Sequence, residues 1–195
     1  MAGVAAQADD RLASALYPHD RVMVEGGVAS PGDSLLVIRV GRRVGTNGHI
    51  VQPVGLLTVE ESAGGMMKAR MVSQFGDARV GDVVVALSPM PDIAQGEPDA
   101  VESGVQGQLL QFLTDEELYG TADIAFLSVG RNAGVGIGDE FGVYLPSLDS
   151  ALSPERVATV RVVRADEGTA TVRVLNASSL ALGNGLPVRL IRSMQ

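Results

Sequence analysis

The feature that most constrains the fold is an order of short segments that occurs twice along the chain. The first copy begins with Asp20-Arg21-Val22-Met23-Val24, passes Gly26-Gly27 and the turn Pro31-Gly32-Asp33, and continues into the apolar residues 35–40. The second begins with Asp123-Ile124-Ala125-Phe126-Leu127, passes Gly130, Gly134 and the turn Ile137-Gly138-Asp139, and continues into residues 141–144. Each copy is typical of a strand, a glycine loop, a Gly-Asp turn and a second strand.

The downstream halves of the two copies also correspond. Residues 56–59 match residues 158–162, residues 67–72 match 170–175, and residues 80–85 match 182–188. Gly64-Gly65 and Asp166-Glu167-Gly168 supply a hairpin turn in each copy. Glycine accepts positive φ, and an Asp side chain accepts hydrogen bonds from nearby backbone N–H groups. We therefore predict structural turns at Gly32, Asp33, Gly81, Asp82, Gly138, Asp139, Gly183 and Asn184.

The valines of the second copy indicate strands. Val160, Val162, Val172 and Val174 alternate with other residues at a period of two, the pattern of a half-buried strand. The 24 glycines and many valines favour short strands and tight turns over long helices. We predict an all-β protein of two similar small β-barrels, SH3-like or swapped-hairpin-like, each of about five strands and related by internal duplication. Chance similarity between two halves rich in Val and Gly is the alternative.

The predicted boundaries follow the repeat. Residues 1–17 are expected to form a tail or a short helix that Asp9 and Asp10 cap. The first barrel is expected over residues 18–88, and the second over residues 105–195. Residues 89–104 between them contain prolines and acidic residues, which is typical of a linker. A strand expected over residues 105–113 belongs to either barrel or bridges them.

Composition excludes several classes of function. The sequence contains no cysteine, which excludes disulfides, Cys-ligated metals and thiol catalysis. The net charge is −8, and an acidic surface repels phosphate backbones, so we expect no nucleic-acid partner. No run of about 18 apolar residues occurs, so we expect no transmembrane helix.

No constellation for catalysis or metal binding is evident. His19 and His49 are the only histidines, and both are predicted to lie on the surface. The glycines from Gly134 to Gly138 lack the spacing and the following helix of a dinucleotide-binding loop. Asp33, Asp82 and Asp139 are better explained as turn formers than as paired catalytic carboxylates. We predict no catalytic, cofactor-binding or metal-ligating residue.

Arginines are the remaining candidates for a site. Arg39, Arg42 and Arg43 form the one basic cluster in the sequence and are a candidate patch for an anionic partner. Arg161, Arg164 and Arg173 are predicted to face outward on strands, where they could bind the same kind of partner. The alternative is a solvated sheet face of mixed charge.

Several segments carry a family resemblance. The run from Gly120 to Val135, the run from Gly138 to Tyr144, and the close from Gly185 to Leu190 resemble the C-terminal region of bacterial LysM peptidoglycan-binding-domain-containing proteins. The start at Tyr17-Pro18-His19-Asp20, Pro31-Gly32-Asp33, and the segment from Phe75 to Asp82 are similar to the same region. The second copy is also similar, more weakly, to the C-terminal barrel of a flagellar assembly protein.

The resemblance implies an exported, non-catalytic region. In such proteins an export signal and a glycan-binding LysM module precede this region, whereas this sequence shows neither a LysM motif nor a full signal. Ala6-Gln7-Ala8 is nevertheless typical of a signal-peptidase site, so we expect a piece of a longer exported protein. Glycan binding is implied for the relatives only.

Taken with the missing catalytic residues, this favours a non-enzymatic interaction or scaffolding module of the cell envelope or periplasm. Its expected partner is a protein or the cell wall, and self-association into a homo-oligomer is compatible with this interpretation. A structural subunit of an envelope filament or flagellar-base-like assembly is the first alternative, and an enzymatic or small-ligand-binding barrel is the second.

Overall fold

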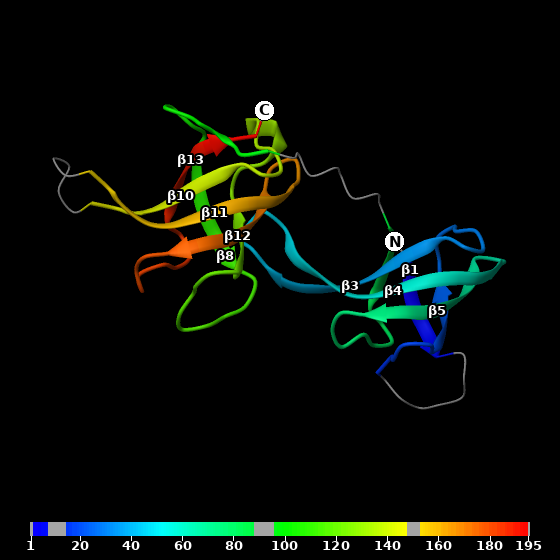
Figure 1. Ribbon diagram of the computed structural model, residues 1–195. Coiled ribbons are helices and arrows are strands. Elements are labelled where there is room, and N and C mark those ends of the chain that lie inside the picture. The colour runs from blue at the N-terminus through cyan, green and yellow to red at the C-terminus, as the bar shows by residue number, and fades with distance from the viewer. Residues whose placement is uncertain (1, 8–14, 88–95, 148–152, 195) are drawn as a thin grey trace. The chain divides into compact units, whose positions relative to one another are not determined.

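The computed structural model describes residues 2–7, 15–87, 96–147 and 153–194 (Figure 1). The protein is all-β, as the sequence predicts, and its strands fall into two compact units, one before residue 88 and one after residue 95. The strands of the first unit are β1 (Ala2–Gln7), β2 (Arg21–Glu25), β3 (Ser34–Arg43), β4 (His49–Ala63), β5 (Met66–Gln74) and β6 (Val83–Ala86). Those of the second are β7 (Asp99–Ala100), β8 (Gln106–Phe112), β9 (Ile124–Leu127), β10 (Glu140–Leu145), β11 (Glu155–Ala165), β12 (Ala170–Ala177) and β13 (Pro187–Ser193).

The first unit is a closed antiparallel barrel with the strand order β1-β2-β5-β4-β3-β6. The ring closes because β1 pairs with β2 on one side and with β6 on the other. The prediction of a tail or helix over residues 1–17 is therefore wrong for Ala2–Gln7, and its helix over residues 9–16 falls largely outside the described residues. The segment AGVAAQ has no alternating pattern, so its strand depends on the two neighbours that it joins.

The second unit is a sheet of seven strands, in which six form a ring. Its order is β10-β11-β12-β9-β8-β13-β7, and an additional pairing joins β10 to β13. The short strand β7 lies outside the ring and pairs with the end of β13. The predicted linker over residues 89–104 is thus partly wrong, because Asp99–Ala100 belong to the second sheet. The strand expected over residues 105–113 is β8, and it belongs to this unit.

The two rings have the same order of pairings. Strands β1 to β6 of the first unit correspond in turn to β8, β9, β10, β11, β12 and β13 of the second. Local hydrogen bonds agree: Val59 N donates to Asp33 O at 2.9 Å, and Val162 N donates to Asp139 O at 2.9 Å. Each unit therefore has six ring strands rather than about five. The internal duplication as an origin stays a prediction.

One correspondence predicted from the sequence is wrong. Val37 pairs with Val84, and Val143 pairs with Val188, so Gly81 corresponds to Gly185 and not to Gly183. Gly81 and Gly185 also share a positive φ, at 97° and 81°. The predicted Gly183-Asn184 turn is therefore displaced to Asn184-Gly185. Sequence similarity alone favoured Gly183, because Asn184 follows it just as Asp82 follows Gly81, and the side chains of Asn and Asp have similar shapes.

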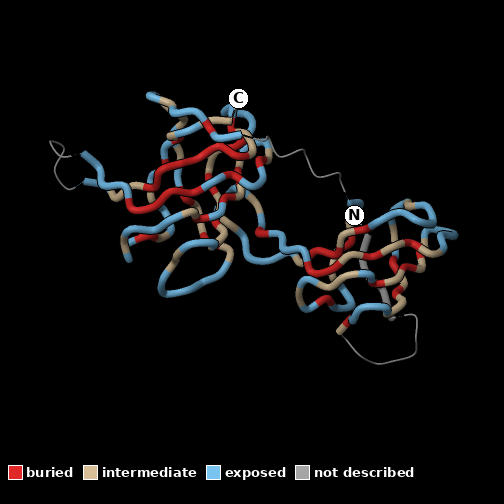
Figure 2. The backbone as a smooth tube through the Cα atoms, viewed as in Figure 1, coloured by how far each residue is buried: buried red, intermediate tan, exposed pale blue. Residues whose placement is uncertain are grey.

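Each barrel encloses its own apolar core (Figure 2). Val22, Leu57 and Met71 are fully buried in the first unit, and Phe112 and Phe141 are fully buried in the second. Alternate residues of each strand point into these cores, so the residues between them form the outer faces of the barrels. The outer faces are where side chains for binding must lie.

Candidate functional site

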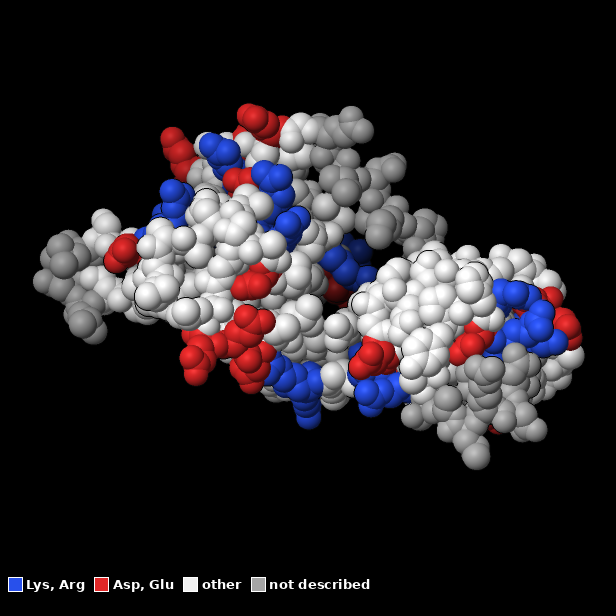
Figure 3. Space-filling view, turned by 60° about the horizontal axis from the view of Figure 1, so that its bottom comes forward, with Lys and Arg blue, Asp and Glu red and all other residues white. Residues whose placement is uncertain are grey.

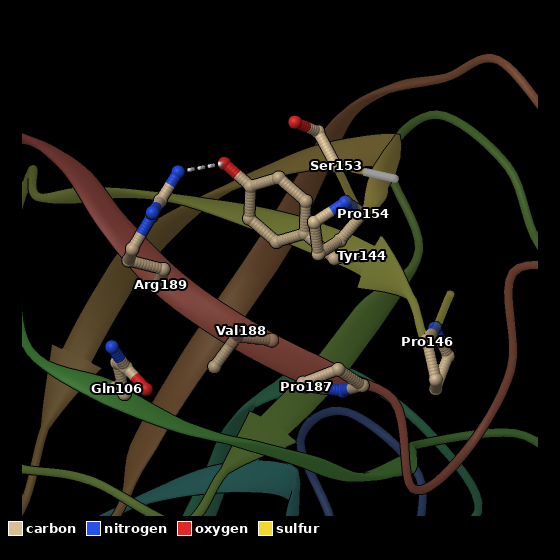
Figure 4. Close-up of a pocket in the computed structure, with 8 residues that line it drawn as sticks. All are labelled: Gln106, Tyr144, Pro146, Ser153, Pro154, Pro187, Val188 and Arg189. Atoms are coloured by element: carbon tan, nitrogen blue, oxygen red, sulfur yellow. Dashed lines mark hydrogen bonds between the residues drawn. The ribbon is translucent and has the colours of Figure 1, made fainter. Parts of the chain in front are cut away.

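A cavity with polar groups lies on the second unit. It has a volume of about 350 Å³ and lies over β8, β10 and β13, beside the start of β11 (Figure 4). The residues that line it are Gln106, Tyr144, Pro146, Ser153, Pro154, Pro187, Val188 and Arg189. This volume is within the range of ligand pockets in proteins.

The tyrosine of this pocket is positioned by a glycine two residues before it. Gly142 and Tyr144 both lie on the outer face of β10, and a Cβ atom on Gly142 would come within 2.8 Å of the Tyr144 hydroxyl oxygen and 2.9 Å of its ring. The ring therefore lies against the backbone at Gly142, where any larger residue would displace it. Gly142 is buried beneath it.

The arginine of the pocket is held against that ring. Arg189 lies directly opposite Gly142 on the neighbouring strand β13. Its guanidinium carbon is 5.2 Å from the centroid of the Tyr144 ring, a cation–π distance, and its Nη2 donates to the Tyr144 hydroxyl at 3.4 Å. Figure 4 shows the two side chains meeting across the pocket mouth. The contact holds the guanidinium group beside the Tyr144 ring.

Prolines make the rest of the wall stiff. Pro146 follows β10 and Pro154 precedes β11, while Pro187 is the first residue of β13, where its missing N–H is tolerated. A proline has few conformations to lose when a ligand binds. Gln106 on β8 lies opposite Arg189 and adds a side-chain amide. The pocket therefore combines rigid apolar walls with a few fixed polar groups.

The lining combines apolar surface with a single cationic side chain among its described residues. Among the described lining residues, one side chain is a cation and none is a carboxylate, an imidazole or a lysine, so the lining supplies no general base for Ser153. An apolar group with a carboxylate next to it fits the walls and the Arg189 guanidinium. Among the residues that the structure describes, a cavity of about 260 Å³ in the first unit is lined by glycine, methionine and aliphatic residues, which supply no comparable polar side chain.

Three of the predicted turns share one geometry. Gly32, Gly81 and Gly138 have φ values of 94°, 97° and 93°. The carboxylate that follows each of these glycines accepts from the backbone N–H three residues before it, at 2.8 Å in all three turns. At the fourth predicted turn, the side-chain oxygen of Asn184 instead accepts from Phe112 N at 3.0 Å.

Two of these aspartates do more than form a turn. Asp82 binds both Nε and Nη2 of Arg39, at 3.2 and 2.9 Å. Asp139 is 1% exposed, and its Oδ1 accepts from Ser193 Oγ at 3.0 Å and from Met194 N at 2.8 Å. These carboxylates hold distant segments of the chain, which is a structural role.

The predicted basic patch is not a cluster of equivalent cations. Arg39 is half-buried and bound by Asp82, and that hydrogen bond raises the pKa of its guanidinium. It also donates to the main-chain oxygen of Asp77. Arg42 and Arg43 are exposed near the end of β3, where Arg43 lies opposite His49. Four residues of strand, roughly 13 Å, separate Arg43 from Arg39, whose guanidinium group is already engaged by Asp82.

The remaining candidates from the sequence do not line the pocket. His19 and His49 are both exposed, and His19 has a positive φ of 76°. Within the glycine-rich run, Gly134 ends the 3₁₀ helix Arg131–Ala133 and Gly138 forms the turn before β10. Among the described residues, no group of three or more His, Asp or Glu side chains is placed to hold a metal ion.

Sequence reasoning missed the pocket, although part of its signal was visible. Only three tyrosines occur, and Tyr144 follows Gly142 at the spacing that places both on one face of a strand. Arg189, by contrast, is 45 positions away in sequence, and only the pairing of β10 with β13 brings it to Tyr144.

Basic and acidic side chains are interspersed on the face shown in Figure 3.

Comparison of the sequence with protein-family models and with curated proteins gives no match. Within the described part of the chain, no helix has the length and apolar character needed to span a membrane.

Proposed function

We propose that this protein is a non-enzymatic binding module of the bacterial cell envelope, which accompanies a peptidoglycan-binding protein and holds a segment of a partner protein. The observation that carries the binding role is the pocket formed by Tyr144 and Arg189 on the second unit. Its occupant is a partner side chain or chain end in which an apolar group lies beside a carboxylate.

The pocket supports this role because its parts are fixed in advance. The Tyr144 ring lies against Gly142, Arg189 lies against that ring, and three prolines stiffen the wall. A preformed site loses little conformational entropy when it binds, so a modest contact area gives useful affinity. The carboxylate adds a charge-assisted hydrogen bond, which is stronger than a neutral one.

The envelope part of the proposal rests on different support. The runs from Gly120 to Val135, from Gly138 to Tyr144 and from Gly185 to Leu190 resemble the region that follows a LysM module in exported bacterial proteins, as do shorter segments of the first unit. In the second unit these segments include most of β10 and the first four residues of β13, two of the strands that line the pocket. The resemblance therefore extends over both units and includes strands that line the candidate site.

Peptide selection against the purified protein tests the binding role. A displayed library of random peptides should yield sequences with a carboxylate next to an apolar side chain. Replacing Arg189 by Gln should weaken binding of the selected peptides about tenfold, the loss expected for one charge-assisted hydrogen bond. Arg164→Gln is the matched control, because Arg164 is 73% exposed and pairs with Asp166 away from the pocket lining.

A second variant tests the positioning of the tyrosine. Gly142→Ala should displace the Tyr144 ring and weaken the same peptides, whereas Gly168→Ala should not, since no atom lies within 4 Å of a Cβ there. Selected peptides that bind all four variants equally would contradict the pocket as the site. Fractionation of the source bacterium tests the envelope role: the protein should be recovered with periplasm or envelope, and recovery with cytosol would contradict it.

A further inference from the structure

The two units contain a β-bulge at the same position of corresponding strands. In the first unit, Val59 pairs with Ala69 and Glu61 with Lys68, which leaves Glu60 as the extra residue of β4. In the second, Val162 pairs with Val172 and Arg164 with Thr171, which leaves Val163 as the extra residue of β11. A bulge turns a side chain out of the regular alternation. Glu60 and Val163 are therefore structural equivalents.

In the first unit the bulge residue supplies a carboxylate to two arginines. Arg21 on β2 lies directly opposite Arg70 on β5. Glu60 accepts from Arg70 Nε at 2.6 Å through Oε1 and from Arg21 Nε at 3.1 Å through Oε2. Like charges that face each other across two strands destabilise a sheet, and the shared carboxylate removes this cost.

In the second unit the equivalent arginine lacks that carboxylate. Arg173 occupies the position of Arg70 and lies directly opposite Arg161 on β11. The bulge residue beside them is Val163, which is 45% exposed. Arg173 is exposed and forms no ion pair with any residue that the structure describes.

The other carboxylate nearby is already engaged. Glu140 Oε1 accepts from Nε and Nη2 of Arg161 at 3.2 and 2.6 Å, and its Oε2 lies 3.8 Å from Arg192 Nη1. Glu140 is thus shared between two arginines on either side of β10. Across β13, β10, β11 and β12, this row places three guanidinium groups against one carboxylate. The uncompensated positive charge lies at the β11–β12 end.

We propose that Arg173 and Arg161 form a docking site for a carboxylate from an acidic segment of a partner protein. The incoming carboxylate takes the place that the Glu60 carboxylate has in the first unit, beside the exposed side chain of Val163. Charge complementarity favours an acidic occupant, and the planar guanidinium groups match the two oxygens of a carboxylate. None of these residues lines the pocket of Tyr144 and Arg189, so this inference does not depend on the proposed function.

The 195-residue chain and a defined peptide test this inference. Acetyl-tetraglutamate amide is titrated into ¹⁵N-labelled protein at low ionic strength, with the arginine Nε–Hε signals as the readout. The signals of Arg173 and Arg161 should shift, and the affinity should fall as salt is added. Arg173→Gln and Val163→Glu should each weaken binding about tenfold, because one removes the cation and the other supplies an internal carboxylate.

Matched controls separate a built site from general charge attraction. Arg164→Gln makes the same charge change as Arg173→Gln on a neighbouring arginine, and Leu180→Glu makes the same change as Val163→Glu at a residue that is 82% exposed. Both controls should keep the wild-type affinity. Conversely, Glu60→Val should create a second site, seen as new shifts of Arg70 and Arg21.

Four results would count against the proposal. The first is the absence of peptide-induced shifts at Arg173 in the wild type, and the second is an equal loss of affinity in the variants and their controls. The third is tighter binding of inorganic phosphate than of the peptide, which would assign the arginines to a phosphate-bearing ligand. Retained binding in Val163→Glu, with unchanged folding by circular dichroism, would count against the Glu60 analogy in the same way.

Discussion

At the scale of single residues, each Gly-Asp turn combines a glycine with positive φ and an aspartate that accepts a backbone hydrogen bond. Gly138 provides a φ of 93°, and Asp139 accepts from Gly136 N at 2.8 Å. The left-handed region costs an ordinary L-residue about 1–2 kcal/mol, so the glycine adopts this conformation without that cost and the aspartate supplies the hydrogen bond. Asp20 and Asp123 accept the same kind of hydrogen bond, from the backbone N–H three residues earlier. The residues before them are His19 and Ala122, which have φ values of 76° and 78°.

Replacing Gly138 by Ala should lower the free energy of unfolding by about 1–2 kcal/mol or more. The new Cβ would occupy a left-handed conformation and would also lie 2.5 Å from Met194 Cγ. Gly136→Ala is the control, since its Cβ would meet nothing closer than Asp139 Oδ2 at 3.8 Å. Denaturant unfolding measures both variants, and equal stabilities would argue against a strained turn at Gly138.

At the scale of elements, the contact between β2, β4 and β5 is electrostatic on its outer face. The hydrogen bond from Arg70, with the charges of Arg70 and Arg21, lowers the pKa of Glu60 below its ordinary value. A carboxyl group whose pKa is lower in the folded state stabilises the fold above its unfolded pKa, which is about 4.3. That contribution disappears as the pH falls through the folded-state pKa.

The variant Glu60→Gln should therefore lose stability at neutral pH and match the wild type in strong acid. The amide cannot ionise, and it leaves Arg21 and Arg70 facing each other without a carboxylate. Urea unfolding at a series of pH values between 7 and 2 measures the difference between the two proteins. Glu61→Gln is the control, because Glu61 is 73% exposed by side chain and its bond to Lys68 is 3.4 Å long. A stability difference that persists unchanged at the lowest pH would contradict ionisation of Glu60 as its source.

At the scale of the whole molecule, two separate cores stabilise two units. Leu57 is fully buried in the core of the first unit, and Phe141 in that of the second. Leu57→Ala should cost about 2–5 kcal/mol and Phe141→Ala about 3–5 kcal/mol, from lost burial and an unfilled cavity. Hydrogen exchange of backbone amides should show the loss of protection in the unit that carries the change. Equal loss throughout both units would contradict separate cores.

The proposed function also predicts a result for the whole chain. The resemblance assigns glycan affinity to a LysM module, and the sequence lacks that motif, so the isolated chain should not pellet with purified peptidoglycan sacculi. Co-sedimentation at ordinary salt is the measurement, with a LysM protein as the positive control. Saturable binding by this chain would replace the protein-partner proposal with a glycan-binding one.

The sequence by itself determined the all-β class, the two halves and most of the tight turns. The turns at Gly32, Gly81 and Gly138 could be predicted because a positive φ is a local requirement that favours glycine. Alternating valines predicted strands because side chains alternate between the two faces of a sheet. The predicted patch of Arg39, Arg42 and Arg43 illustrates what local sequence cannot predict. Asp82 binds Arg39 although it lies 43 positions away in the sequence.

Only the tertiary structure decided what depends on pairing between distant strands. Ala2–Gln7 forms a strand because it pairs with neighbouring strands, and β7 belongs to the second sheet because it pairs with β13. The fourth turn lies at Gly185, which has a positive φ, and not at Gly183. The tertiary structure also brought Arg189 to Tyr144, and Arg173 to Arg161. Register is fixed by the closure of each ring and by its bulges, and a shift of one residue would turn every side chain to the opposite face. The outer faces, where both candidate sites lie, are therefore a property of the closed barrel and not of any local segment.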